Sequence, residues 1–195
     1  MILLGETRKK RFKVFLTFLI ALLAILLIIN NSTTLLKLIF PMKYEEYVYK
    51  YSEKSNVDPY LVFAVIKAES GFKPGAVSKK DAKGLMQITE KTGNWGAQNL
   101  NLNQYNNQSL FNPEINICIG CWYLGNLMKE FNNNLDLVIT AYNGGSGNVN
   151  EWLKDKSLSN TGNSLEKIPF KETERYVKKV RDYYFIYKRL YEKPS

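Results

Sequence analysis

The sequence predicts a mainly α-helical protein, with one helical domain preceded by an N-terminal transmembrane helix. Apolar residues recur every three to four positions in several segments, and no segment alternates apolar and polar residues over the length of a strand. Two capping pairs, Asp58-Pro59 and Asn112-Pro113, each precede such a periodic stretch. The length of 195 residues, with 45% hydrophobic residues, suits a single domain with one core.

The N-terminal segment is set apart by its charge and its apolarity. Five cations between positions 8 and 13 precede an apolar run from Val14 to Ile29, and the next charge is Lys37. A helix over about residues 12–34 approaches the roughly 30 Å thickness of the hydrocarbon core. The basic flank predicts a cytoplasmic N-terminus, which places the following chain outside. We therefore expect a single-pass protein of the cell membrane, with residues 1–36 as the anchor segment and residues 37–195 as an extracytoplasmic domain.

A cleaved signal peptide is the alternative interpretation of this segment. Its basic and apolar regions have the same order in the sequence, but no small-x-small cleavage site follows the apolar run. Whichever holds, the segment explains much of the net charge of +9. Only Glu6 opposes its five cations, so residues 1–36 carry +4 and the remaining domain carries +5.

The composition excludes several kinds of chemistry. The sequence contains no histidine, which excludes Ser-His-Asp and Cys-His triads, histidine-ligated zinc, a proximal histidine for haem and any imidazole acid or base. We expect no cofactor and no metal. Catalysis, if present, must use carboxylates, hydroxyls, lysines or the two cysteines.

Capping signals and periodicity predict the helices of the domain in order. The first is expected from Tyr44 to about Asn56. Asp58 and Pro59 predict the start of the second, as an N-cap followed by proline at the first helical position. Gly71 predicts its end. A loop is expected over residues 72–83, which are polar and rich in lysine and glycine.

Three more helices are predicted further along the chain. Asn112-Pro113 repeats the cap-plus-proline signal. Asp136 is expected to cap a short helix that Asn143-Gly144-Gly145 ends. A long C-terminal helix is predicted from the apolar stripe that runs from Tyr176 to Leu190.

Cys118 and Cys121 form a C-x-x-C pair within the helix that follows Pro113. Both fall on its apolar periodicity, so we expect them to pack in the core as small hydrophobic residues. A disulfide or redox pair is one alternative. A zinc site is another, although two thiolates without histidine make an incomplete ligand set.

Glu69 stands out among the carboxylates on physical grounds. It continues the apolar stripe of Val62, Val65 and Ile66, which places it on the face that packs into the core. It also falls in the last turn of its helix, where the negative end of the macrodipole opposes ionisation. Both effects predict a raised pKa. A carboxylic acid that stays protonated near neutral pH can protonate the leaving oxygen in glycosidic cleavage. The alternative is a solvated glutamate at a frayed helix end.

Several short motifs follow one another along the chain between about residues 44 and 190. They are Ala64-Val-Ile-Lys-Ala-Glu69-Ser70-Gly71-Phe72, Ala76-Val-Ser78, Gly84-Leu-Met-Gln87-Ile, Asn112-Pro113 with Ile117-x-x-Gly120-x-x-Tyr123-Leu124, Ala141-Tyr142-Asn143-Gly144-Gly145, and Ile168-Pro-Phe-Lys-Glu172-Thr173-Glu-Arg-Tyr176-Val177. Together and in this order, they resemble the lytic transglycosylase domain of the soluble lytic transglycosylase type.

The resemblance implies a lysozyme-like helical domain whose cleft binds the glycan strands of peptidoglycan. Members of this family cleave the β-1,4 bond between N-acetylmuramic acid (MurNAc) and N-acetylglucosamine (GlcNAc), and the muramoyl 6-hydroxyl attacks the anomeric carbon to give a 1,6-anhydro product. The single catalytic acid of the family corresponds to Glu69, which first donates a proton and then accepts one. The expected partners are therefore glycan strands and the membrane, and nucleic-acid binding is not expected because no such module is recognisable.

The resemblance also implies substrate-binding roles for other residues. Ser78 is expected to orient Glu69 or the N-acetyl group of the substrate. Gln87, Tyr142 and the adjoining Asn143 are expected to line the sugar subsites, and Glu172 and Tyr176 to lie across the cleft. Each role has a structural alternative: Ser78 as a turn residue, Gln87 as a surface amide, Tyr142 as a core residue and Glu172 as a first-turn acid of the last helix.

The sequence departs from the family pattern at some positions and leaves two other functions open. Thr89-Glu90 stands where many members have Met-Pro, and Asp81 stands where glycine is common. Asp81 or Glu90 could supply a second carboxylate, which would make the protein a lysozyme-type hydrolase. A peptidoglycan-binding protein with little turnover is the third possibility, against which the acid on an apolar helix face argues.

Overall fold

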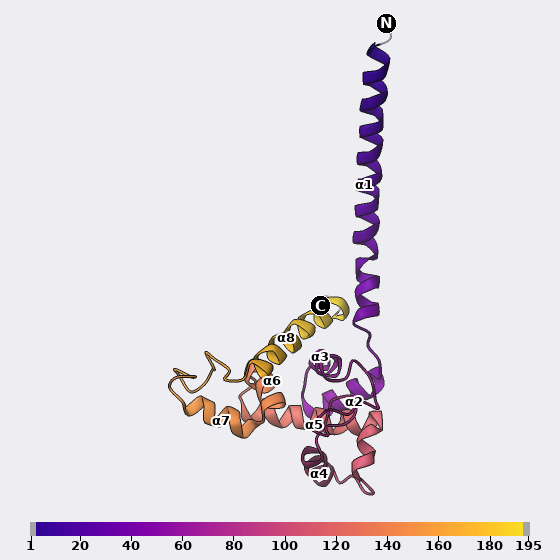
Figure 1. Ribbon diagram of the computed structural model, residues 1–195. Coiled ribbons are helices and arrows are strands. Elements are labelled where there is room, and N and C mark those ends of the chain that lie inside the picture. The colour runs from indigo at the N-terminus through magenta and orange to yellow at the C-terminus, as the bar shows by residue number, and fades with distance from the viewer. Residues whose placement is uncertain (1–2, 193–195) are drawn as a thin grey trace. The chain divides into compact units, whose positions relative to one another are not determined.

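The computed structural model describes residues 3–192, and within the first helix it describes the side chains of residues 11–23, 25–26 and 33–39. The chain forms two compact units, Met1–Pro41 and Met42–Ser195. The mainly α-helical class is confirmed (Figure 1), because helices and loops make up the described chain. In place of strands, the described residues form only isolated bridges, which pair Lys83 with Val77 and with Ile88.

The N-terminal unit is a single helix, α1 (Leu3–Ile39), which is longer than the helix expected over residues 12–34. Its described side chains are exposed, including large apolar ones such as Phe12 at 65% and Phe18 at 66%. Among the residues that were described, no helix combines the length and the apolarity needed to cross a membrane. The transmembrane helix predicted from the sequence is therefore not confirmed by the structure.

The C-terminal unit begins with α2 (Glu45–Ser55) and α3 (Pro59–Glu69), both at the predicted positions. Asp58 caps α3 by accepting a hydrogen bond of 2.8 Å from the amide of Tyr60. All residues from 61 to 66 are buried, so every face of this part of α3 lies in the core. A buried helix of this kind fixes the position of its last residue, Glu69.

The centre of the unit is α5 (Pro113–Glu130), which carries the cysteine pair. It packs against α2, α4 (Glu90–Asn99), α6 (Leu135–Gly144) and the 3-10 helix η1 (Asn107–Phe111). Asn112 caps it, as predicted, by accepting from the amides of Glu114 at 2.9 Å and Ile115 at 3.2 Å. Its middle residues are buried, which makes α5 the main core helix.

Two features of the helical order differ from the prediction. The N-cap of α6 is Asn134, whose side chain accepts from the amide of Leu137 at 3.3 Å, so the predicted cap at Asp136 is wrong. Asp136 lies instead in the first turn of α6, where its negative charge interacts favourably with the positive end of the helix dipole. Moreover, α4 and α7 (Ser146–Lys154) are helices that the periodicity did not indicate.

The last helix, α8 (Lys171–Tyr191), packs against α3 and α6 (Figure 1). The predicted apolar stripe is its buried face, which includes Tyr176, Val180 and Tyr187. Tyr187 stacks on Phe63 of α3 with ring centroids 5.6 Å apart. This packing places the first half of α8 beside the C-terminal end of α3.

Candidate active site

The end of α3 is held by contacts that begin in the local sequence. Gly71 has a positive φ of 60°, and its amide bonds the carbonyl of Ile66 at 3.1 Å, which ends the helix as predicted. The hydroxyl of Ser70 donates to the carbonyl of Leu85 at 2.7 Å. The carboxyl group of Glu69 therefore extends from a rigid helix end, which a hydrogen bond holds to the loop around Leu85.

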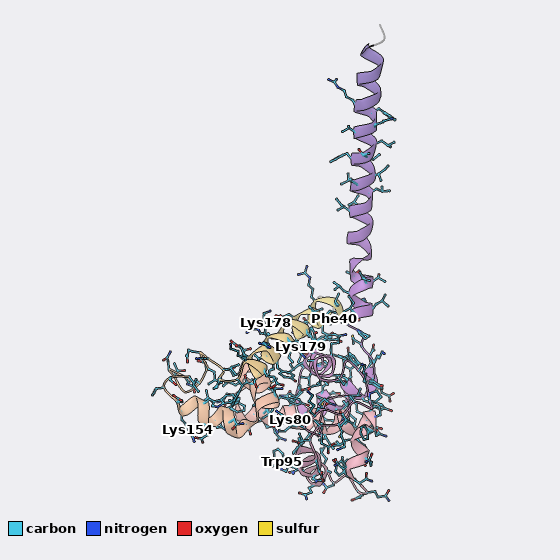
Figure 2. The ribbon with its side chains drawn as sticks, in the orientation of Figure 1. Phe40, Lys80, Trp95, Lys154, Lys178 and Lys179 are labelled. Atoms are coloured by element: carbon cyan, nitrogen blue, oxygen red, sulfur yellow. The ribbon has the colours of Figure 1, made fainter. Side chains whose placement is uncertain are left out.

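Two groups from α8 surround the Glu69 carboxyl. The hydroxyl of Tyr176 donates to Oε1 of Glu69 at 2.7 Å. Nζ of Lys179 donates to the carbonyl of Ala68 at 2.9 Å (Figure 2), close enough for its charge to act on Glu69. Tyr176 is only 7% exposed, whereas Glu69 is partly exposed, so the hydrogen bond lies at the edge of the core.

Burial raises the pKa of the Glu69 carboxyl, as the sequence predicted. The hydrogen bond from Tyr176 and the charge of Lys179 oppose this effect, but burial is the larger cause. The acid therefore favours its protonated form more than an ordinary glutamate does. It also has a hydrogen-bond donor and a cation in place to stabilise the carboxylate once the proton leaves.

Tyr142 of α6 is the second tyrosine whose pKa responds to the charge of the acid. Its hydroxyl donates to the carbonyl of Met86 at 2.8 Å. Burial, followed by the charge of Glu69, raises the pKa of both Tyr142 and Tyr176 well above the ordinary value. Both tyrosines thus remain phenols at neutral pH, and each can serve as a hydrogen-bond donor.

A buried asparagine holds the loop that carries Met86 and Gln87. Asn116 of α5 is fully buried; its Oδ1 accepts from the amide of Met86 at 2.8 Å, and its Nδ2 donates to the carbonyls of Lys83 at 2.9 Å and Leu110 at 2.8 Å. The backbone of Gly84 has φ 79° and packs so closely on Asn116 that a Cβ atom would not fit. The loop is therefore fixed by side-chain hydrogen bonds rather than by a sheet.

A cavity of about 460 Å³ opens next to Tyr142, and we call it the α4–α6 cavity. Its walls come from the loop after Met86, from α4, from Tyr123 of α5, and from the chain between α6 and α7. Aromatic rings line one side: Tyr123 lies 6.2 Å from Trp95 and 5.5 Å from Tyr142, measured between ring centroids. An open cavity with aromatic walls and neutral polar groups suits a carbohydrate ligand.

This geometry can be compared with known proteins. The sequence model of the family described as "Transglycosylase SLT domain" matches residues 46–164, which is more than half of the chain. The chain belongs to the transglycosylase SLT domain family. Outside the matched range lies α8, which supplies Tyr176 and Lys179.

Relatives of the SLT domain include longer proteins. A soluble lytic murein transglycosylase of Salmonella typhimurium is 32% identical over 151 residues, covering 76% of this chain and 23% of that protein. A membrane-bound lytic murein transglycosylase C of Edwardsiella ictaluri is 33% identical over 176 residues, covering 76% of this chain and 47% of that protein. The chain thus spans between about a quarter and a half of the length of these relatives.

A solved structure supports the fold. The lytic transglycosylase Slt of Pseudomonas aeruginosa, determined as an inactive mutant, superposes with a TM-score of 0.72 at 30% identity. The match covers 82% of this chain and 26% of that one. The lysozyme-like helical class implied by the sequence resemblance agrees with this neighbour.

The structure brings together five of the seven site residues expected from the sequence. Glu69 and Tyr176 are hydrogen-bonded, and Tyr142 is close enough for the charge of Glu69 to shift its pKa. Gln87 and Asn143 line the α4–α6 cavity with Tyr142. Gln87 has φ 51°, and its side-chain amide donates to the carbonyls of Ala76 at 3.1 Å and Gly84 at 2.9 Å, so it also braces the loop.

The other two expected residues, Ser78 and Glu172, lie at exposed positions of the C-terminal unit. Ser78 is exposed in the loop after α3, where its hydroxyl accepts from the amides of Ala82 at 3.0 Å and Lys80 at 3.2 Å. Glu172 is exposed in the first turn of α8. These are the turn and helix-end positions that the sequence offered as alternatives.

Other residues of the SLT domain that shape the site were not expected from the sequence. Lys179 could have been found, since it follows Tyr176 by three positions on one predicted helix. Trp95 carried no such signal because α4 itself was not predicted. Asn116 appeared only as one residue within a predicted apolar helix.

The cysteine pair of the SLT domain lies on α5. Both thiols are free, and Cys121 is completely buried, as expected for core packing. Burial raises the pKa of both thiols, which lowers their reactivity. Among the side chains that the structure describes, no group of three or more Cys, Asp or Glu residues is placed to hold a metal ion.

Proposed function

We propose that this chain is a peptidoglycan lytic transglycosylase, which cleaves the β-1,4 bond between MurNAc and GlcNAc and forms a 1,6-anhydro-MurNAc end. The observation that carries the proposal is the state of Glu69: a partly buried acid with a raised pKa, hydrogen-bonded to Tyr176 in a family whose relatives are described as lytic murein transglycosylases. Remodelling of the cell wall is the process that such a reaction serves.

Glu69 serves as both acid and base in the proposed reaction. Its protonated carboxyl donates to the glycosidic oxygen as the bond breaks, and the N-acetyl group of the substrate acts as the internal nucleophile. The resulting carboxylate is stabilised by the hydroxyl of Tyr176 and by the nearby charge of Lys179. It then accepts the proton of the muramoyl 6-hydroxyl while the oxygen of that hydroxyl attacks the anomeric carbon. The bond from the anomeric carbon to the N-acetyl oxygen breaks, which closes the anhydro ring, releases the N-acetyl group and restores the acid.

The positions of the other acids favour this route over hydrolysis. Asp81 pairs with Lys83 at 2.5 Å, and its side chain is 65% exposed. Glu90 accepts from Nδ2 of Asn107 at 3.0 Å, at the start of α4. A glycosidase with two catalytic carboxylates needs both at the scissile bond, about 5–10 Å apart. The described side chains that shift the pKa of Glu69 are Tyr176 and Lys179, and neither is a carboxylate. This environment favours the route with one carboxylate.

Products released from intact sacculi by the full-length chain test the proposal. Mass spectrometry should find 1,6-anhydro-muropeptides, and Glu69→Gln should lower their release by at least about a thousandfold while leaving the fold intact. Products with only reducing ends would establish the lysozyme-type hydrolase instead. Binding to sacculi without any release by the wild type would establish the low-turnover binding protein.

We further propose that α1 attaches the protein to the cell membrane as a single-pass anchor, with a cytoplasmic N-terminus and the C-terminal unit outside. The basic residues before Val14, the exposed apolar side chains of α1 and the membrane-bound relative support this assignment. The protein should stay in the membrane fraction after alkaline carbonate extraction. A mature chain that is soluble and begins after the apolar run would establish a cleaved signal peptide.

A further inference from the structure

The α4–α6 cavity contains one charged side chain among its lining residues, and that charge is positive. Lys91 of α4 lies on the wall, its side chain is exposed, and the lining includes no carboxylate. The nearest acid along the chain, Glu90, accepts a hydrogen bond from Asn107 of η1. The ion pairs formed between described residues use other lysines. A cation without a counter-charge in a cavity attracts an anionic group on the ligand.

One helical turn further on, Trp95 of α4 (labelled in Figure 2) also lines the cavity. Lys91 and Trp95 are four residues apart on α4 and therefore share one face of the helix. The Trp95 ring is fixed by an edge contact with Trp122, with centroids 4.6 Å apart, yet 47% of the residue is exposed. A rigid, half-exposed indole beside a cavity can pack against the apolar face of a sugar ring.

We propose that the α4–α6 cavity is a subsite for an acidic sugar residue, in which Trp95 packs on the ring and Lys91 pairs with a carboxylate. This inference rests on the proposed function, because it identifies the sugar as the muramoyl residue of peptidoglycan. GlcNAc is neutral. MurNAc bears a lactyl group, whose carboxylate is free in strands without peptides, and the stem peptides bear the carboxylates in other strands.

A charge-selective subsite would fix the register of the strand in the cleft. The two sugars alternate, so only every second glycosidic bond has MurNAc on the side where a 1,6-anhydro ring forms. Tyr142 lines the cavity and donates to the carbonyl of Met86, whereas Ser70, the residue after Glu69, donates to the carbonyl of Leu85. The cavity and the acid are therefore both tied to the same short loop. Selecting the muramoyl residue at the α4–α6 cavity therefore presents the correct bond to Glu69. In this role Lys91 and Trp95 determine specificity and take no part in proton transfer.

Binding of a matched pair of ligands tests the inference. The full-length chain carrying Glu69→Gln is used in detergent, so that the ligand is not consumed, and affinity is measured by isothermal titration calorimetry. One ligand is a peptide-free GlcNAc-MurNAc oligosaccharide with free lactyl carboxylates, and the other is its methyl ester. We expect the ester to bind about fivefold more weakly than the acid. This ratio is the largest change in affinity that the loss of one exposed ion pair typically causes.

Variants of Lys91 identify the group responsible for the difference. Adding Lys91→Met should abolish the difference between acid and ester, and Lys91→Arg should restore it because it restores the charge. Lys154→Met is the matched control: this exposed lysine on α7 pairs with Glu151 at 2.8 Å, and its removal should leave the difference unchanged (Figure 2). Trp95→Ala should weaken the binding of the acid and the binding of the ester to the same extent.

The comparison is repeated with a peptide-bearing oligosaccharide and its methyl ester. The inference is overturned if the Glu69→Gln chain with Lys91 in place binds acid and ester equally in both the peptide-free and the peptide-bearing series, or if Lys91→Met leaves their difference intact. A Lys91-dependent preference confined to peptide-bearing strands would support the subsite and identify the stem peptide as the source of the carboxylate. These measurements need no turnover. Failure of the wild type to release anhydro products would therefore refute the proposed reaction without deciding the binding result, and the reverse also holds.

Discussion

Replacement of Glu69 by Gln is expected to stabilise the C-terminal unit at neutral pH. Burial raises the pKa of this carboxyl above its value in the unfolded chain, so ionisation works against folding. Gln is almost the same size and remains neutral. Its amide oxygen can still accept the hydrogen bond that Tyr176 gives to the carboxyl. The variant thus keeps the contact and removes the buried charge.

The size of the effect follows from opposing contributions at the site. An ionised carboxylate loses several kcal/mol of solvation when it is buried. A hydrogen bond to a charged group returns about 1.5–3 kcal/mol, and here the Tyr176 hydroxyl lies 2.7 Å from Oε1. Because burial remains the larger influence on the pKa, we expect a net gain of about 1–2 kcal/mol in the free energy of unfolding at pH 7. For a domain of this size, that gain raises Tm by about 2–8 °C.

The gain should depend on pH in one direction. A carboxyl whose pKa is raised by folding contributes its full stability below the unfolded pKa, near 4.5, and loses it as the pH rises through the folded pKa. The wild type and Glu69→Gln should therefore be equally stable near pH 4 and separate as the pH increases.

Tryptophan fluorescence during thermal unfolding of the full-length chain can measure this difference. All three tryptophans lie in the C-terminal unit, so the signal reports on that unit alone. Glu172→Gln is the matched control: Glu172 is exposed in the first turn of α8, and its loss should destabilise slightly, by about 0.3–1 kcal/mol. Equal stability of the wild type and Glu69→Gln at pH 7, or an equally large gap at pH 4, would refute the reasoning.

Two further substitutions test the groups around the acid. Tyr176→Phe removes the donor that stabilises the Glu69 carboxylate, so the pKa of Glu69 should rise and the alkaline limb of the pH profile for kcat/KM should move to higher pH. The maximal rate of anhydro-muropeptide release should fall about tenfold, and a limb that moves to lower pH would contradict this role. Asn116→Ala should lower the free energy of unfolding by about 2–4 kcal/mol in urea titrations, because three buried hydrogen bonds are lost. The control Asn126→Ala loses one local bond to the carbonyl of Trp122 and should cost less than about 1 kcal/mol; equal losses would argue against the bracing role of Asn116.

The helices that were predicted correctly have signals within a few residues. For α3 and α5, an N-cap, a proline and an apolar stripe act together, and the structure contains each of these contacts. Gly71 ended α3 for a reason that is equally local, its positive φ. Such elements can be predicted because the forces that define them act along the chain.

The sequence could not predict α4, because its stability comes from other elements. Two glycines, Gly93 and Gly96, disfavour a helix on intrinsic propensity. A Cβ at Gly93 would collide with the hydroxyl of Tyr105, and one at Gly96 would press on Ile119. The glycines let α4 pack closely on its neighbours, so tertiary contact overrides propensity.

The contrast between local signals and tertiary contacts also applies to the candidate site. Glu69 could be selected from the sequence because its helical face and its place in the last turn are local properties. Its hydrogen-bond partner could not, because Tyr176 is 107 residues away and was placed across the cleft only by the family resemblance. Trp95 and Lys91 were missed together with α4, the helix that carries them both.

The separation between Glu69 and Tyr176 also affects how the site forms during synthesis. Ribosomes make the chain from the N-terminus, so Glu69 emerges long before α8, which provides both Tyr176 and Lys179. A product truncated before Lys171 contains the acid but lacks the hydroxyl that bonds it and the cation that acts on it. The environment of Glu69 is therefore complete only after α8 has been made and has packed against α3.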